Sequence, residues 1–329
     1  MYIFFKNFLI FLIFPFLLLI GYLLTDPFMV IRNYDSFNAP KVSLNRDFVS
    51  TESFIKNHKV NNYNSFIFGS SRTMAFRPSS WKKYLKEKDN PFLFDASSEN
   101  FHGIFSKIKF IDSLKIPLDN VLIVLCRDVS FPGYKNVDGH LFVKHYKVIK
   151  SSFFSYHFVF LKAYFNPSFL ISWYSFLLTN KKQKWMGSNL EERKIFFDTK
   201  SNEQLILNET YDLKKLPNHS YFKQKDIFYD RKGEFLDSIS KISKYDFQNM
   251  IELIKIFKKN ETNFRIIISP LYEQIKFNKE DYSKLKSVFG DFLYDFSGKT
   301  NFSINKLNYF ESSHYRTNVG DSILSIIYK

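Results

Sequence analysis

The sequence predicts an α/β protein with an open, doubly wound and mainly parallel sheet, a helical insertion and one apolar N-terminal helix. Short runs that are apolar throughout, such as Val121–Leu125, suit central parallel strands because both of their faces are covered. Stretches with apolar residues at helical spacing lie between these runs, which is the alternation of a βαβ fold. A chain of 329 residues is long enough for one large domain with an insertion.

The N-terminal segment is the first element in order. Phe8–Leu24 is almost wholly apolar and is flanked by Lys6 and Asp26, and about 17 residues is the lower limit for a membrane span. We therefore expect a transmembrane anchor over residues 1–25, in which Pro15 is a tolerable kink. A cleaved signal peptide is the alternative, although no small-x-small cleavage site follows the run. The anchor implies a single-pass protein whose domain lies outside the cytoplasm.

The net charge of +15 comes from lysines that are spread along the chain. There is no arginine-rich block, zinc-finger spacing or RNP motif, so we do not expect nucleic-acid binding. Attraction to an anionic membrane face or wall polymer remains compatible with the charge. Cys126 is the single cysteine, which excludes an intramolecular disulfide.

The polar, irregular stretch 26–60 is predicted to be a tether, followed by one α/β domain over 61–329. Ser65–Phe68 is the first expected strand, and the helix after it should start at Pro78 and continue to Lys88. Later strands are predicted at Phe92–Ala96, Val121–Leu125, Phe264–Ser269 and Phe292–Phe296. Helices are predicted over Phe101–Leu114, around Phe247–Phe257 and ending at Leu285–Phe289.

Residues 130–226 break this alternation and are predicted to be an insertion. Two helical stripes begin at Phe154 and Phe169, and we expect their aromatic faces to pack on the domain; a lid or a membrane-surface patch is the alternative. A second membrane span is not expected, since the continuous apolar part, Phe169–Leu178, is too short. The mostly polar stretch Lys200–Lys225 is predicted to be a loop.

A serine follows the first strand, and an acid and a histidine lie near the C-terminus. Gly69-Ser70-Ser71-Arg72 ends the apolar run, and Glu311-Ser-Ser-His314 pairs a carboxylate with an imidazole. A serine nucleophile needs a base that is itself held by a third group. We predict Ser71 as nucleophile, His314 as base and Glu311 as the orienting acid, with Ser70 as the alternative nucleophile.

The other histidines carry weaker signals. His102 is a possible rival base but is better explained as a surface or core residue. His140 and His145 lack a matching carboxylate pattern, so no metal site is expected. No phosphate loop, Gly-x-Gly-x-x-Gly, Cys-x-x-Cys or His-Glu-x-x-His occurs, and no cofactor is expected.

These two motifs resemble the first and last blocks of the SGNH/GDSL hydrolase superfamily, whose fold is flavodoxin-like. Ser71 stands where Gly-Asp-Ser-Leu has its nucleophile, and Glu311 replaces the aspartate of Asp-x-x-His. The resemblance covers Phe66–Cys126 and Lys241–Ile327. Within the second range, Arg265–Pro270 is similar to a strand of membrane-anchored members that act in envelope polymer acylation, including the teichoic-acid D-alanyl transfer protein and alginate acetylation proteins.

The superfamily's two middle blocks, which feed the oxyanion hole, are altered in this chain. Ser98 or Asn100 would donate in the second block, and Arg127 or Asp128 would occupy the third. Losing one oxyanion donor typically costs about 2.7–4 kcal/mol of barrier. The resemblance therefore implies a nucleophile and a base more clearly than it implies an oxyanion hole.

By resemblance, the expected function is that of a membrane-anchored serine esterase or O-acyltransferase in a bacterial envelope. The implied substrate is an acylated saccharide or polymer, and a multi-span membrane O-acyltransferase is an implied partner. The alternative is a non-catalytic assembly or binding protein on the same fold, in which the anchor and the insertion dock a membrane partner.

Overall fold

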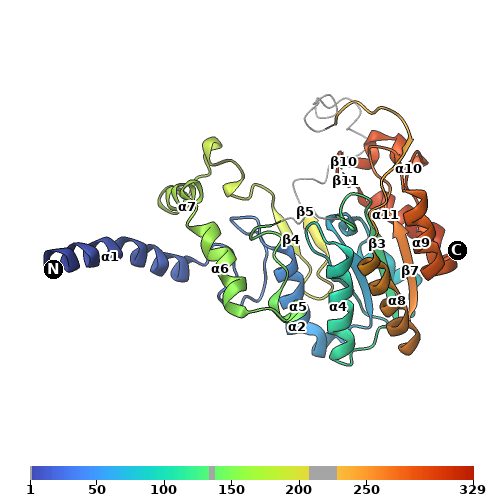
Figure 1. Ribbon diagram of the computed structural model, residues 1–329, viewed down its shortest axis with the longest axis horizontal. Helices are drawn as coiled ribbons and strands as arrows, with labels where there is room; N and C mark the ends of the chain where they lie inside the picture. Colours follow the sequence, from blue (N-terminus) through green and yellow to red (C-terminus); the bar gives the residue numbers. More distant parts are fainter. Residues whose placement is uncertain (1, 133–137, 207–227) are drawn as a thin grey trace.

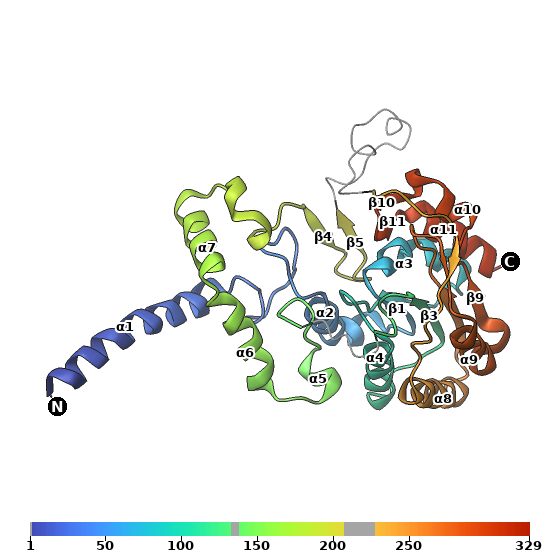
Figure 2. The same ribbon diagram turned by 45° about the horizontal axis from the view of Figure 1, so that its top comes forward.

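The computed structural model describes residues 2–132, 138–206 and 228–329, with side chains from residue 13 onward. Its centre is a five-stranded parallel sheet with the order β2-β1-β3-β7-β9 (Figures 1 and 2). The strands are β1 Ser65–Gly69, β2 Pro91–Leu93, β3 Asn120–Leu125, β7 Asn263–Ile268 and β9 Leu293–Asp295. All five predicted strands are present, because each is an apolar run short enough to be covered on both faces.

Side chains alternate between the two faces of the sheet, and helices cover both faces. Phe66 and Phe68 of β1 point into one core, whereas Ile67 points into the other. The helices of the first core are α2 Arg46–Asn61, α4 Phe101–Ser113, α8 Lys244–Lys259 and α9 Lys279–Phe289. Those of the second core are α3 Pro78–Trp81 and α11 Thr317–Ile327. The strand order reverses direction between β1 and β3, and in such sheets ligands bind at the carboxyl ends of the strands beside this point.

The helix predicted to continue to Lys88 is shorter in the structure. α3 ends at Trp81, and only a 3-10 turn, η2 Lys82–Tyr84, follows it. The carboxylate of Asp89 accepts the N–H of Lys86 at 3.0 Å, so local side-chain capping closes a turn where the charged sequence offers no apolar face to extend a helix.

The stretch 26–60 is not a tether. Its first part packs with helices of the insertion in a further apolar core, in which Phe28 is 1% exposed. Its second part forms α2, which starts at the N-cap Asn45, whose side chain accepts the N–H of Phe48 at 2.8 Å. Val49 and Phe54 of α2 are fully buried. The prediction was wrong here because two charged residues of α2, Arg46 and Asp47, are also buried. Charged residues on the buried face interrupt the apolar pattern by which a helix is recognised in the sequence.

A cluster of buried charges explains this pattern. Lys107 of α4 is 1% exposed and contacts Asp47 at 2.7 Å and Glu99 at 2.6 Å. Arg46 pairs with Asp95 at 2.8 Å, and Lys144 pairs with Glu99. Three cations therefore face three carboxylates, and α2, α4 and the loop after β2 are joined by charge as well as by apolar contact.

The region 130–226 contains helices, as predicted, in its described part. These are α5 Tyr146–Ile149, α6 Phe153–Tyr164 and α7 Pro167–Thr179, followed by the 3-10 segment η3 Lys184–Asn189. An antiparallel hairpin, β4 Ile195–Phe197 and β5 Gln204–Ile206, comes next. Its second strand, β5, lies in the stretch 200–225 that we expected to be a loop, so that prediction was wrong at these residues. The rest of the stretch, from residue 207, lies outside the described residues.

The N-terminal helix α1, Tyr2–Thr25, projects away from the domain and covers the apolar segment of the sequence (Figure 1). Over residues 2–132, 138–206 and 228–329, no helix has both the length and the apolar character required to cross a membrane. The first part of the predicted anchor, up to residue 12, has no described side chains. The anchor therefore stays a prediction.

Candidate active site

Ser71 lies where the chain leaves the carboxyl end of β1. The strand ends at Gly69, whose φ is +149° and whose position has no room for a side chain, since a Cβ would lie 2.5 Å from the carbonyl oxygen of Val124. Ser71 then begins the 3-10 helix η1, Ser71–Ala75. The glycine lets β1 pack closely on β3 while the chain turns, so the serine lies at the sheet edge beside the topological switch point.

Glu311 and His314 lie on a small antiparallel hairpin, β10 Tyr309–Glu311 and β11 His314–Tyr315. The two residues are directly opposite one another across the strands, which brings their side chains together. The Oγ of Ser71 is 2.6 Å from the Nε2 of His314, and the Nδ1 of His314 is hydrogen-bonded to the Oε1 of Glu311. Three residues that we predicted from two distant motifs therefore form one hydrogen-bonded chain.

The surroundings of Glu311 favour its ionised form. Burial alone would raise its pKa, but the hydrogen bond and charge of His314, the N–H of Ser313 at 2.6 Å and the charge of Arg72 lower the pKa below its usual value. An ionised Glu311 accepts the Nδ1–H of His314. The Nε2 of a neutral His314 then faces Ser71 with a free lone pair, which is the arrangement a general base requires.

Arg72 joins the two motifs, and sequence reasoning missed this role. Its side chain is almost fully buried and forms two hydrogen bonds with the carboxylate of Asp128, at 2.8 and 3.1 Å. Its Nε donates to the carbonyl of Ser313 at 2.7 Å. The residue that follows the predicted nucleophile thus holds the turn between Glu311 and His314 against the end of β3. A bidentate arginine has the geometry for such a brace.

Helix α11 supports the site from the second face of the sheet. A Cβ on Gly320 would lie 2.0 Å from the carbonyl oxygen of Ala75, so only glycine allows α11 to contact η1. Close to it, Val319 and Tyr315 are packed in the same core as Ala75. This explains why Gly320 follows the last motif: it sets the distance between the segment that holds Ser71 and the segment that holds His314.

The alternative nucleophile, Ser70, points elsewhere. It is buried, and its Oγ lies 3.4 Å from the Sγ of Cys126 on the far side of the strand end. Neighbouring residues leaving an extended strand point to opposite sides, so Ser71 and Ser70 do not share a partner. Of the two serines, Ser71 is the one in contact with His314.

The four residues predicted for the oxyanion hole have different places in the structure. Ser98, with φ of +50°, lines the same cleft as Ser71. Asn100 caps α4, because its side-chain oxygen accepts the N–H of Gly103 at 2.9 Å. Arg127 pairs with Asp237 at 3.0 Å, and Asp128 holds Arg72. The structure therefore places Ser98 in the same cleft as Ser71, and it gives Asn100, Arg127 and Asp128 structural contacts.

Replacing Asn100 by alanine should distinguish these roles. As a helix cap, Asn100 contributes about 0.5–2 kcal/mol to the free energy of unfolding, and its loss should leave the turnover of an ester substrate within about twofold. Loss of an oxyanion donor would instead lower kcat by about 10²–10³-fold. The matched control is Asn278→Ala, which removes the N-cap of α9. Equal destabilisation of both variants with unchanged kcat supports the cap, and a large fall in kcat for Asn100→Ala alone contradicts it.

Ser71 and His314 open onto a cleft of about 700 Å³. One wall is formed by η1 and the β10–β11 hairpin, and the opposite wall by Phe142 and the β4–β5 hairpin of the insertion. The lining mixes aromatic side chains, including Phe142 and Phe310, with polar ones, including Ser43, Gln204 and Asn318. The insertion thus contributes to the cleft, although its sequence contains no recognisable catalytic motif.

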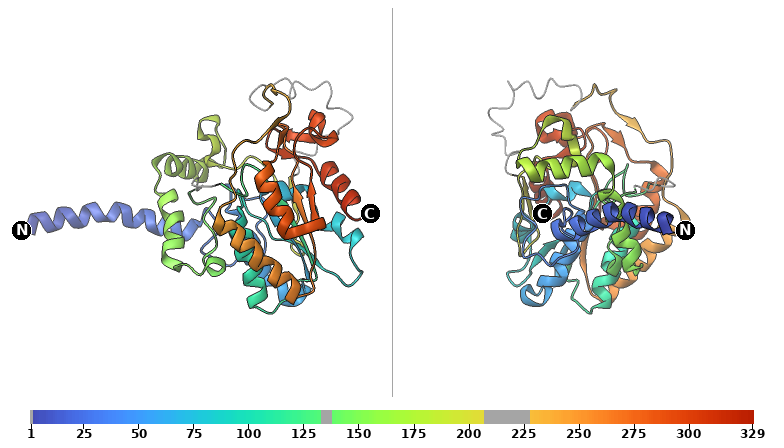
Figure 3. Two further views of the ribbon diagram at one scale, coloured as in Figure 1. Left: turned by 45° about the vertical axis from the view of Figure 1, so that its right-hand side comes forward. Right: turned by 90° about the vertical axis from the view of Figure 1, so that its left-hand side faces the viewer.

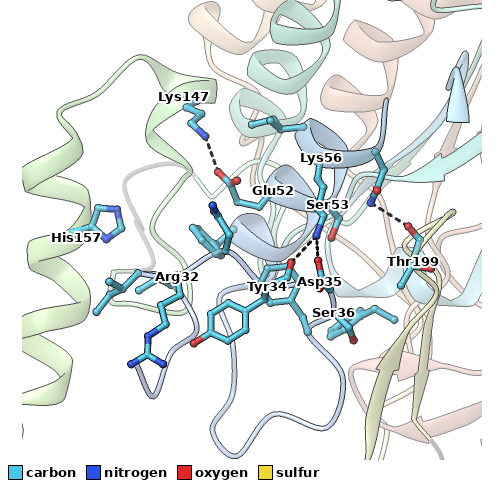
Figure 4. A pocket seen from close by; sticks show the side chains of 18 of the residues that line it. Arg32, Tyr34, Asp35, Ser36, Glu52, Ser53, Lys56, Lys147, His157 and Thr199 are labelled. Atoms are coloured by element: carbon cyan, nitrogen blue, oxygen red, sulfur yellow. Dashed lines mark hydrogen bonds and ion pairs between the residues drawn. The ribbon is translucent and has the colours of Figure 1, made fainter. Parts of the chain in front are cut away.

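A second cleft, of about 670 Å³, lies at the base of α1 (Figure 4). Its lysines are paired: Lys56 contacts Asp35 at 2.5 Å, and Lys147 contacts Glu52 at 2.9 Å. Cations and carboxylates are balanced along its wall, so this cleft has no charge preference that would identify a ligand.

The remaining histidines do not assemble a site in the described chain. His102 lies on the exposed side of α4 beside Tyr245, and the ring of His140 packs on Phe28. His145 is buried and contacts Glu52 at 2.9 Å. Across the ranges that the structure covers, no three histidine, cysteine or acidic residues are grouped closely enough to hold a metal ion.

The fold and the site define an α/β protein with a hydrogen-bonded serine, histidine and glutamate at the carboxyl edge of a parallel sheet. No family model matches the sequence, and a search of curated proteins finds no similar one. What the protein does must therefore be argued from its own residues.

Proposed function

We propose that this protein is a serine acyl esterase or O-acyltransferase that acts through an acyl-enzyme on Ser71. One observation carries the proposal: the Oγ of Ser71 is 2.6 Å from the Nε2 of His314, whose other ring nitrogen is hydrogen-bonded to Glu311. A serine is activated by a base that a third group orients, and all three groups lie beside a cleft large enough for a substrate.

In the proposed reaction, the Oγ of Ser71 attacks an ester carbonyl carbon while its proton passes to the Nε2 of His314. The C–O bond to the alcohol breaks as His314 returns that proton to the leaving oxygen, and the acyl group remains on Ser71. His314 then takes a proton from water or from a saccharide hydroxyl as that oxygen attacks the acyl carbon. The ester bond to Ser71 breaks, and His314 returns the proton to the Oγ of Ser71. Proton transfer of this kind contributes about 10²–10⁴-fold, and Glu311 stabilises the imidazolium formed in each step.

The oxyanion would be held by the backbone N–H of Ser71, at the start of η1, and by a donor from Ser98 on the facing loop. Both residues line the cleft. Preorganised donors at this position are usually the largest single contribution to acyl transfer.

The acceptor or donor is proposed to be a surface polysaccharide. The cleft is lined by aromatic side chains such as Phe142 and Phe310, by uncharged polar ones such as Gln204, and by charged ones such as Glu191 and Arg193. Sugars combine hydroxyl groups, which polar and charged side chains can bind, with apolar ring faces. The apolar sequence of α1 supports a membrane anchor with the domain facing the bacterial envelope. A multi-span O-acyltransferase would then be a fitting source of acyl groups.

A serine-reactive fluorophosphonate tests the proposal directly. Wild-type protein should be labelled at Ser71, Ser71→Ala should not be labelled, and Ser70→Ala, the matched control, should keep labelling. Absence of labelling in the wild type, or equal labelling in Ser71→Ala, would contradict an activated Ser71. Mass spectrometry of the labelled peptide identifies the serine.

A non-catalytic binding protein is the second candidate. The observation that favours it is that Asn100, Arg127 and Asp128 all have structural partners, which leaves few side chains for an oxyanion hole. Such a protein would bind the saccharide polymer in the same cleft. It would do so equally well after Ser71→Ala, and neither form would react with fluorophosphonate.

A further inference from the structure

Helices α6 and α7 expose large apolar side chains that a soluble surface would normally bury. Phe154 of α6 is 82% exposed and Leu178 of α7 is 86% exposed. Other exposed members of this surface are Phe153, Phe158, Ile171, Leu177 and, on η3, Trp185. Large exposed apolar side chains gathered on neighbouring helices are typical of sites of interaction. We call these seven residues the α6–α7 surface.

The charge of the same part of the chain is entirely of one sign. Residues 141–190 contain seven lysines and no aspartate or glutamate, whereas the whole chain has 32 acidic residues among 329. Lys144, Lys147 and Lys182 pair with carboxylates from outside this range. Lys162 lies on α6, and Lys181 and Lys184 follow α7. Exposed aromatic and aliphatic side chains on helices that also carry or adjoin lysines suit the boundary of an anionic lipid bilayer.

The α6–α7 surface belongs to the same structural unit as the end of α1. The hydroxyl of Tyr164 donates to the carbonyl of Leu18 at 3.0 Å, and the Nε1 of Trp173 donates to the Oγ1 of Thr25 at 3.2 Å. A Cβ on Gly21 would lie 2.1 Å from the hydroxyl of Tyr174, so α1 and α7 are in close contact at this glycine. Helices α6 and α7 are therefore both hydrogen-bonded to the last turns of α1.

These contacts place helices α6 and α7 next to the point where α1 leaves the domain. Viewed from that end, α1 runs obliquely in front of the domain, and α7 lies across the domain beside it (Figure 3, right). On the N-terminal side of its contacts with α6 and α7, α1 exposes Phe14, Phe16 and Leu17. Arg32 donates to the carbonyl groups of Leu23 and Leu24 at the C-terminal end of α1. A cation therefore lies at the end of α1 that is next to the α6–α7 surface.

We infer that the α6–α7 surface lies in the headgroup region of an anionic lipid bilayer, beside an inserted α1. The aromatic and leucine side chains enter the boundary between headgroups and acyl chains, and the lysines contact lipid phosphates. This surface would hold the domain against the membrane at a fixed orientation. The inference concerns membrane contact and does not depend on catalysis at Ser71.

Spin labels on the full-length protein in nanodiscs test the inference locally, since bulk binding would report α1 alone. Phe158→Cys and Leu178→Cys are labelled on the α6–α7 surface, and Tyr245→Cys on α8 is the matched control, because Tyr245 is also an exposed aromatic residue. The native Cys126 is buried, and unsubstituted protein treated with the same label measures any reaction there.

In nanodiscs that contain phosphatidylglycerol, labels at 158 and 178 should be accessible to oxygen and protected from a water-soluble nickel complex, and the label at 245 should show the reverse. Pure phosphatidylcholine, or Lys181→Gln with Lys184→Gln, should place the first two labels at shallower depth. Water accessibility at 158 and 178 overturns the inference and leaves the surface to a protein partner. Spin–spin broadening there would assign it to a second copy, and equal depth in both lipids would exclude anionic recognition.

Discussion

Replacing His314 by alanine is expected to lower kcat for p-nitrophenyl acetate by about 10⁴–10⁶-fold, as removal of the histidine from a serine triad does. Without the imidazole, Ser71 keeps its proton and is a poor nucleophile. The release of p-nitrophenol reports acylation of Ser71, so the assay detects the same step whether water or a saccharide later accepts the acyl group.

The matched control is His102→Ala, because His102 is the other histidine that we considered as a base and it lies on the exposed side of α4. This variant should retain kcat within about twofold, as expected of a surface substitution away from the reacting groups. A fall of less than tenfold in His314→Ala, with an unchanged melting temperature, would show that the contact of 2.6 Å between Ser71 and His314 is not used in acyl transfer.

The second large effect is expected on stability. Lys107→Met should lower the free energy of unfolding by about 3–5 kcal/mol, because it removes one partner from a buried ion pair and leaves the others without compensation. Lys107 contacts Asp47 and Glu99, both of which are buried. Methionine keeps most of the side-chain volume, so the loss reports charge pairing rather than a cavity. Urea unfolding measures it.

Lys109→Met provides the comparison on the same helix. Lys109 is exposed, and its replacement should change the free energy of unfolding by no more than about 0.5 kcal/mol. If both variants were equally stable, the charged cluster would contribute nothing beyond its packing.

Within the same cluster, the pH dependence contributed by Asp47 has a defined sign, whereas burial raises the pKa of Asp95 and acts in the opposite direction. Burial opposes ionisation of Asp47, but the charges of Lys107 and Lys144 lower its pKa below the usual value. A lowered folded-state pKa stabilises the protein at pH values above the unfolded pKa of about 4, and this contribution is lost as the pH falls through the folded value. Lys107→Met should weaken this acid dependence.

The pattern of short apolar runs was sufficient to predict the central sheet. β3 and β7 were predicted to within one residue at each end, because strands buried on both faces leave a continuous apolar signal. Helix α2 was missed because its buried face contains Arg46 and Asp47. Burial of a charge depends on a partner such as Asp95 or Lys107, which no local pattern reveals.

The site shows the same division. The types and order of Ser71, Glu311 and His314 were readable because each motif is short and local. The hydrogen bonds from Arg72 to Asp128 and Ser313 could not be predicted from the sequence, since these three residues are separated by up to 241 positions in the chain. Asn100 was expected near the oxyanion, yet it caps α4, because the nearest unsatisfied N–H belongs to the helix that it precedes.

By itself, the sequence determined the five strands of the central sheet and most of the helices around it, because these depend on periodicity. It also indicated Glu311, His314 and a pair of candidate serines, because each motif consists of neighbouring residues. Only the tertiary structure decided that Ser71 rather than Ser70 contacts His314 and that Arg72 joins the two motifs. The same holds for the hydrogen bonds between α1 and helices α6 and α7. Each of these depends on distances between segments far apart in the chain, and such distances are set by packing.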